Sequence, residues 1–137
     1  MFISINYLAV CAAALSTIIV GALWYGPLFG KIWISLMGFT PKHMEELKKR
    51  GAGKSYALAF IGSLVMAYVL AHFTSIWETI GIGDAFQLAF WIWLGFIATT
   101  TLGSVLWEGK SWKLYLLNIA HQFLSLFVMT SILTLWR

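Results

Sequence analysis

Charged residues and cysteines are scarce in this sequence. Of its 137 residues only 10% are charged, whereas 61% are hydrophobic. Soluble domains are about a quarter charged and about half apolar, so this composition excludes an ordinary water-soluble fold. The single cysteine, Cys11, excludes an intramolecular disulfide, and a metal site would need other kinds of ligand. We therefore expect no metal and no cofactor.

The hydrophobic residues are gathered in four runs. Each run is about as long as the roughly 20 residues that cross the hydrocarbon core of a membrane as a helix. The runs cover approximately residues 3–25, 55–76, 85–107 and 114–136. No Lys or Arg precedes the first run, which is longer than the core of a signal peptide, so we expect it to be kept as a span. The prediction is an all-α membrane protein in which residues 1–137 form a single domain, a bundle of four transmembrane helices.

Basic residues are concentrated in two of the connections between these runs. They are Lys31, Lys42, Lys48, Lys49, Arg50 and Lys54 in the first connection, and Lys110 and Lys113 in the third. On the other side of the membrane only Arg137 is basic. Because Lys and Arg near span ends favour the cytoplasmic side, we predict a multi-pass protein of the cytoplasmic membrane, with residues 31–54 and 108–113 inside and both termini outside. Anionic lipid headgroups are then the expected acidic partner, and nucleic acid is not expected.

The stretch LWYGPLFGKIW, residues 23–33, breaks the first run abruptly. Proline cannot continue a helix, and aromatic rings and lysines are typical of the headgroup level of a membrane. The predicted interfacial anchors are Trp24, Tyr25, Pro27, Lys31 and Trp33, and, after the third run, Trp107, Lys110 and Trp112. Further on, Thr40 and Pro41 signal a helix start and Gly51 signals its end. We expect a short cytoplasmic or interfacial helix between the first two spans.

Small residues recur every four positions on the first three runs. They are Ala9, Ala13 and Gly21 on the first, Ala59, Ala67 and Ala71 on the second, and Gly95 and Gly103 on the third, with Thr17, Ser63 and Thr99 in the same stripes. Such stripes let helix backbones approach closely in lipid, so we expect spans one to three to form the tight core. The fourth span is bulkier. We expect it to face lipid or a second copy in a homo-oligomer.

Several short blocks of this sequence are similar to a known family. They are NYLAV at 6–10, LWYGPLFGKIW at 23–33, LMG at 36–38, WLGFIATT at 93–100, WEGK at 107–110 and LYLLN at 114–118. Together they resemble the bacterial family catalogued as domain of unknown function 1761, over nearly the whole chain. The resemblance implies a compact multi-span protein, here placed in the bacterial inner membrane. It implies no known activity and transfers no catalytic residue.

Acidic and basic side chains are missing from the middle of the predicted spans. Their lack argues against ion or proton transport coupled to a carboxylate, since such relays place acids within the membrane. Serine, threonine and histidine are present, but no acid at span depth could orient a histidine for nucleophilic catalysis. We therefore expect no enzyme, and this class ranks third.

Uncharged polar residues do occur in the spans, and they fall at a similar depth. Counting about eight residues from each cytoplasmic end, at 1.5 Å per residue, reaches a level roughly 12 Å deep. The residues there are Ser16 and Thr17, Ser63, Thr99 and Thr100, and, on one face of the fourth span, Asn118, His121, Gln122 and Ser125. Our hypothesis is that they line a water-accessible pocket. His121 and Asn118 would be the principal contacts to a solute, with Gln122, Thr99 and Ser63 as support.

Two functions compete at this point. In the first, the protein is a small-solute binding or permeation unit whose site is this polar layer. In the second, it is a structural or accessory membrane protein whose basic cytoplasmic segment binds lipid or a partner. The polar layer is also compatible with plain packing, because Ser and Thr in membranes often satisfy backbone carbonyls.

Overall fold

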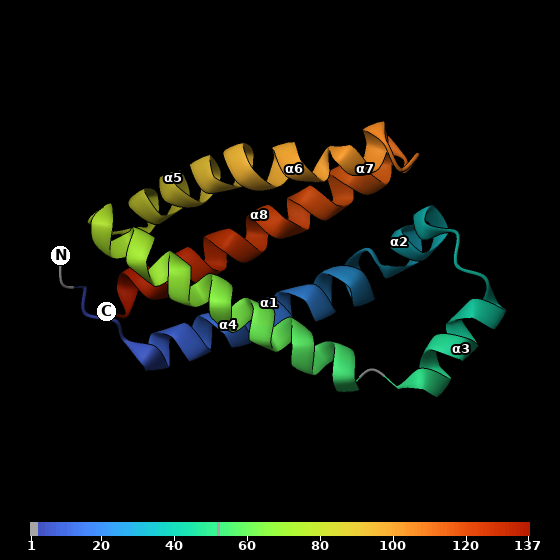
Figure 1. Cartoon of the computed structure of the whole chain (residues 1–137), viewed down its shortest axis with the longest axis horizontal. Helices are drawn as coiled ribbons and strands as arrows, with labels where there is room; N and C mark the ends of the chain where they lie inside the picture. Colours follow the sequence, from blue (N-terminus) through green and yellow to red (C-terminus); the bar gives the residue numbers. More distant parts are fainter. Residues whose placement is uncertain (1–2, 52) are drawn as a thin grey trace.

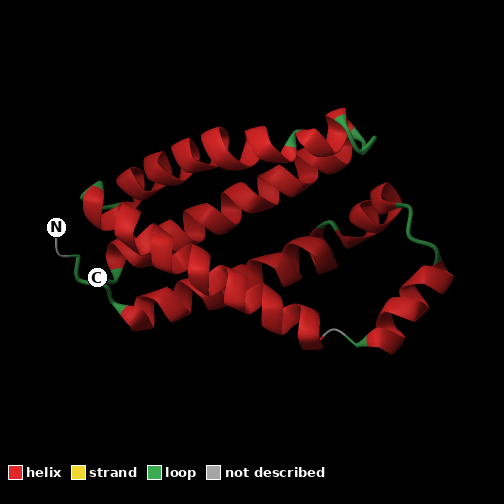
Figure 2. Ribbon diagram, in the orientation of Figure 1, coloured by secondary structure: helices red, strands yellow, loops and turns green. Residues whose placement is uncertain are grey.

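The computed structural model describes residues 3–51 and 53–137, and the described chain is folded into helices joined by short loops (Figure 2). Four helical segments are long and apolar enough to span a membrane: Tyr7–Leu28, Gly53–Ile76, Ile82–Leu106 and Trp112–Leu135. Each has 22 to 25 residues, and at 1.5 Å per residue such a helix exceeds the roughly 30 Å of a hydrocarbon core. The protein is thus an all-α membrane protein built on a four-helix bundle, as the sequence predicts.

Local sequence signals set where the helices begin and end. Helix α1 (Tyr7–Leu23) follows Asn6, whose side chain accepts hydrogen bonds from two backbone N–H groups of the first turn. Helix α3 (Pro41–Arg50) starts after Thr40, whose hydroxyl accepts from the His43 N–H at 3.2 Å, and it ends at Gly51 with φ of 77°. The predicted short helix between spans one and two is confirmed.

The first span ends in a widened turn. After α1 the chain forms a π-helical turn, η1 (Trp24–Leu28), which contains Pro27, and then bends into helix α2 (Gly30–Met37). The Phe29 N–H donates to the Trp24 carbonyl at 2.9 Å. A Cβ at Gly30 would lie 2.7 Å from the Tyr25 carbonyl oxygen, so this bend requires glycine. The helical path continues past the predicted end at Tyr25.

Helix α8 (Trp112–Leu135) occupies the centre of the bundle. It packs against α1, α4 (Gly53–Ile76) and α5 (Ile82–Ile92), and it lies between the other long helices in Figure 1. A third of its most apolar stretch is buried (33%), against 17% for the span that begins at Ile82. The expectation that span four lies outside a core made by spans one to three is therefore wrong. Bulky residues such as Leu126 and Leu133 fill the bundle interior instead of facing lipid.

The third span is the peripheral one. It consists of α5, a second π-helical turn η2 (Trp93–Ala98), α6 (Thr99–Thr101) and α7 (Gly103–Leu106), and its main contacts are with α8. Its buried face runs through Ala85 and Ala89 to Ala98. The predicted stripe does not pack: Gly95 and Thr99 are exposed, and a Cβ on Gly103 would meet only the side chain of Trp107 from the same span. A π turn contains one more residue than an α-helical turn, so the residues that follow it face a different direction. The predicted stripe assumed a constant spacing of four residues and did not include this shift.

The small residues of spans one and two pack at one end only. Ala9, Ala13, Ala67 and Ala71 are buried and cluster with bulky residues of α8. Helices α1 and α4 cross near the middle of the bundle and separate beyond the crossing (Figure 1). On the α3 side of the crossing Ala59 is exposed and lines a cavity. The small residues of the two helices therefore pack at Ala9, Ala13, Ala67 and Ala71 and not at Ala59.

Hydrogen bonds fasten the bundle at this terminal end. The Arg137 guanidinium donates to the carbonyl oxygens of Thr74 and Thr79, and the hydroxyls of Thr79 and Thr134 lie 2.8 Å apart. The Asn6 amide donates to the Trp136 carbonyl at 3.3 Å. These contacts join the end of α4, the turn after it, the end of α8 and the residue before α1. The bundle is closed here and open at the opposite end.

Candidate functional site

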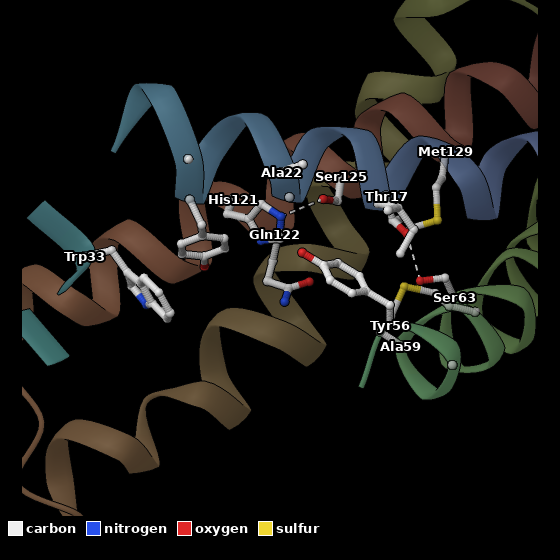
Figure 3. A pocket seen from close by; sticks show the side chains of 16 residues that line it. Thr17, Ala22, Trp33, Tyr56, Ala59, Ser63, His121, Gln122, Ser125 and Met129 are labelled. Carbon is white, nitrogen blue, oxygen red and sulfur yellow. Dashed lines mark hydrogen bonds between the residues drawn. The ribbon is translucent and has the colours of Figure 1, made fainter. Parts of the chain in front are cut away.

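A cavity of about 800 Å³ lies where α1 and α4 diverge. Its walls come from the second half of α1, η1, α2, the first half of α4 and the middle of α8 (Figure 3). The polar side chains in its lining are Thr17, Tyr25, Tyr56, Ser63, His121, Gln122 and Ser125. The lining contains no Asp, Glu, Lys or Arg among the described residues. The cavity therefore offers hydrogen bonds and aromatic surface without a fixed charge.

His121 lies beside two aromatic rings of η1. Its ring centroid is 4.9 Å from that of Tyr25 and 6.1 Å from that of Trp24. Its Nε2 is 3.3 Å from the Ser125 hydroxyl, one helical turn further along α8. A Cβ on Gly21 would lie 3.6 Å from this nitrogen. Gly21 therefore leaves room at the cavity wall beside His121, whereas the sequence suggested a contact between backbones.

Two buried ring nitrogens beside the cavity have no hydrogen-bond partner in the described part of the chain. They are His121 Nδ1 and Trp24 Nε1. An unpaired buried donor costs about 1–3 kcal/mol, and an orphaned N–H is rarer than an orphaned acceptor. This cost favours the histidine tautomer with a bare Nδ1, in which Nε2 donates to Ser125. The hydroxyls of Thr130 and Ser131, further along α8, are also buried without a partner, so this feature is not confined to the cavity.

Tyr25 is held in place by the fourth span. Its hydroxyl donates to the Asn118 side-chain oxygen at 2.7 Å. Its ring centroid lies 5.1 Å from that of Trp33 on α2, so the two rings together form one aromatic wall. Asn118 is not in the cavity lining, unlike its hydrogen-bond partner Tyr25, so the structure gives no support to its predicted role as a direct solute contact.

A pair of hydroxyls marks the inner limit of the cavity. The oxygens of Thr17 and Ser63 are 2.8 Å apart, and they join α1 to α4 (Figure 3). Thr17 donates to the Ala14 carbonyl, so Ser63 is the donor between the two. Beyond this pair, Ala13 and Ala67 are completely buried. The cavity therefore stops near the middle of the bundle and lies on the α3 side of this pair.

The structure brings together part of the predicted polar layer. Thr17, Ser63, His121, Gln122 and Ser125 line one cavity. Ser16 instead donates to the Ala13 carbonyl, and Thr99 and Thr100 donate to carbonyls of their own span. The two threonines are exposed because the third span lies on the periphery, with its main contacts to α8.

Sequence reasoning missed the aromatic part of the cavity. Tyr25 and Trp33 were predicted as interfacial anchors, and Tyr56 was not singled out, yet all three line the cavity. Their inward direction depends on the π turn and on the divergence of α4. The sequence does contain a signal for Tyr56. It precedes Ala59 by three residues and Ser63 by seven, so it shares their helical face and could have been assigned to the same site.

The lining is suited to holding a molecule. Among residues 3–51 and 53–137, no group of three or more His, Cys, Asp or Glu side chains could hold a metal ion. Imidazole, carboxamide and hydroxyl groups can donate to and accept from a ligand, and the aromatic walls can stack on it. The arrangement is that of a small-molecule pocket, with apolar walls and a few polar groups that fix orientation.

The fold and this cavity define a class: an all-α membrane protein of four spans with a polar-lined cavity at one end. The chain belongs to the family described as Protein of unknown function (DUF1761), whose family model matches residues 8–134. The family indicated by the sequence blocks is thereby confirmed. No curated protein and no solved structure matches the chain. The function has to be argued from the cavity itself.

Proposed function

We propose that this protein binds a small uncharged molecule within the membrane, in the cavity between α1, α4 and α8. The observation that carries the proposal is a cavity of about 800 Å³ lined by aromatic and uncharged polar side chains. Ligand pockets have volumes of about 300–1,000 Å³ and this kind of lining. A charged solute would find no opposite charge among the described lining residues, so an uncharged one fits better.

Each lining group has a defined role in this proposal. His121, through an Nε2 N–H shared between Ser125 and the solute, and Gln122 supply the principal hydrogen bonds. In Figure 3 the Gln122 carboxamide extends away from α8 into the space between the helices. Ser125 orients the His121 ring. Tyr25 and Trp33 form the aromatic wall, and Tyr56 faces the cavity from α4. The solute is therefore one with a flat or apolar body and one or two polar groups.

Binding is better supported than permeation. A solute crossing the membrane would have to pass the packed layer beyond Thr17 and Ser63, where Ala13, Ala14 and Ala67 are completely buried. Passage would require α1 and α4 to separate at their closest contact.

Exchanging the polar groups for leucine tests the proposal. A panel of uncharged small molecules is first screened for those that raise the melting temperature of the purified protein. With the best stabiliser as probe, His121→Leu and Gln122→Leu should each lower affinity by roughly 2- to 12-fold, because each loses a hydrogen bond of about 0.5–1.5 kcal/mol. His72→Leu and Gln87→Leu are the matched controls, since neither residue lines the cavity. Equal losses in variants and controls would refute the site.

The location of the protein and its orientation are part of the proposal. We expect the bacterial cytoplasmic membrane, with the α3 end of the bundle in the cytoplasm. The basic residues of α3 and its flanks support this orientation. The expected homo-oligomer stays a prediction, and the exposed Gly95 and Thr99 of the third span offer the close-packing surface that α8 cannot.

A reporter fusion tests the orientation. Alkaline phosphatase fused after Arg137 should be active, because this enzyme needs the oxidising periplasm for its disulfides. The same reporter inserted between residues 109 and 110 should be inactive. An inactive C-terminal fusion together with an active internal one would reverse the topology.

A further inference from the structure

A second cavity lies next to the first, between α2, α3 and α4. Its volume is about 720 Å³. Most of its lining is apolar: Trp33, Phe39, Met44, Leu47 and Ala59. The polar lining residues are Lys48, Ser55 and Tyr56. Among the described residues, the lining of this cavity thus combines a long apolar surface with a single cationic side chain.

The face that α3 turns to this cavity is defined by helical spacing. Leu47 and Lys48 follow Met44 by three and four residues and share one face with it, so two apolar side chains and one cation line the cavity that α4 borders on the other side. The neighbouring basic residues Lys49 and Arg50 do not line the cavity. Lys48 is therefore the cation of this site, although the whole of α3 is basic.

On the α4 side of this cavity, a second feature favours binding of an anion. Ser55 lies in the first turn of α4, which begins at Gly53. The free N–H groups and the positive dipole end of a helix stabilise negative charge in that turn. The Ser55 hydroxyl can donate in the same direction. Lys48 and Ser55 thus flank the cavity from two different helices.

We propose that this second cavity binds one anionic phospholipid. Its phosphate would lie between Lys48 and the first turn of α4 at Ser55, and an acyl chain would lie along Met44, Leu47 and Ala59. The site is at the start of a membrane span, where phospholipids are the most concentrated amphiphiles. A free phosphate would gain nothing from the apolar walls, and a peptide would need partners for its many backbone polar groups.

The lipid would also border the first cavity. Trp33, Tyr56 and Ala59 line both cavities. The Trp33 ring contacts Phe39 with centroids 5.5 Å apart, and Phe39 stacks on His43 of α3 at 4.7 Å. An aromatic row therefore connects α2 to α3 along the shared wall. A bound lipid would fix the position of α3 beside the cavity opening. The headgroup part of the lipid site is separate from the solute site, because Lys48 and Ser55 are not in the first cavity.

Native mass spectrometry of the full chain in mild detergent can test the lipid site. The protein is titrated with phosphatidylglycerol, with phosphatidylcholine and with glycerol 3-phosphate, which has the anionic group without the chains. We expect one phosphatidylglycerol to be retained, and much less of the other two. Lys48→Gln should weaken phosphatidylglycerol retention by about tenfold, since it loses a charge-assisted contact. Lys49→Gln is the matched control, with the same change of charge one residue away, and it should stay within about twofold of wild type.

Four outcomes would overturn the proposal. Equal losses in Lys48→Gln and Lys49→Gln would mean diffuse attraction of lipid to a basic surface. If phosphatidylcholine were retained as well as phosphatidylglycerol, the negative charge of the lipid would not contribute to binding. If glycerol 3-phosphate bound tightly, the acyl chains would not contribute, and the site would be one for free anions. If the spectra showed a protein dimer without bound lipid, we would conclude that a second copy of the chain covers the cavity. Since no solute is needed, failure here leaves the solute site untouched.

Discussion

Replacing Gly21 with leucine should strongly weaken solute binding without unfolding the protein. The first added carbon would lie 3.6 Å from His121 Nε2, an ordinary contact distance. The rest of the side chain would then occupy the cavity that Gly21 lines. Overfilling a packed site costs about 1–3 kcal/mol, which corresponds to a roughly 5- to 150-fold loss of affinity. Leucine is also a better helix former than glycine, so α1 should persist.

The measurement is affinity for the stabilising probe described above, with the melting temperature of the unliganded protein as the check on folding. Gly83→Leu is the matched control. It makes the same exchange in helix α5, at a position outside the cavity where the new Cβ would meet no described atom within 4 Å beyond its chain neighbours and the adjacent helix backbone. Normal binding by Gly21→Leu would show that the solute does not use this cavity.

Replacing Ala13 with leucine should instead destabilise the protein itself. Ala13 is completely buried, and it belongs to the core cluster formed by α1, α4, α5 and α8. The larger side chain has no cavity to enter, so the helices must move apart at the cost of their van der Waals contacts. Overpacking of this kind costs about 1–3 kcal/mol. The melting temperature in detergent should fall clearly.

Ala120→Leu provides the comparison for this second variant. Ala120 lies in the middle of α8 but is exposed, so the same added volume meets lipid or detergent. Its melting temperature should stay close to that of wild type. If Ala13→Leu melted at the same temperature as Ala120→Leu, the core around α1 and α4 would be looser than the structure shows.

These two leucine substitutions separate positions that look alike in the sequence. Ala13 and Gly21 are on the same stripe of small residues, which predicts tight helix packing for both. In the structure Ala13 is in the core, whereas Gly21 lines a cavity. The difference arises because α1 and α4 diverge beyond Thr17 and Ser63. A sequence stripe gives the face of a helix, and it does not give the point along that face where the neighbouring helix departs.

In the candidate site, too, the sequence predicts some features and the packing of the helices decides others. His121, Gln122 and Ser125 share a face of α8 by spacing alone, so the sequence could group them. Thr99 was grouped with them by its depth, yet the third span presents it outward. Depth follows from counting residues along a helix. Direction depends on which neighbours the helix packs against, and counting carries no information about that.

The sequence by itself determined the four spans and the short helix α3. Length and hydrophobicity fix a membrane helix, because every backbone polar group must be paired within lipid, and side-chain caps such as Thr40 act over three residues. Only the tertiary structure decided that α8 is central and that Tyr25, Trp33 and Tyr56 turn inward to one cavity. These features depend on two π turns and on contacts between residues far apart in the chain, such as Tyr25 with Asn118. Local propensity does not encode such contacts.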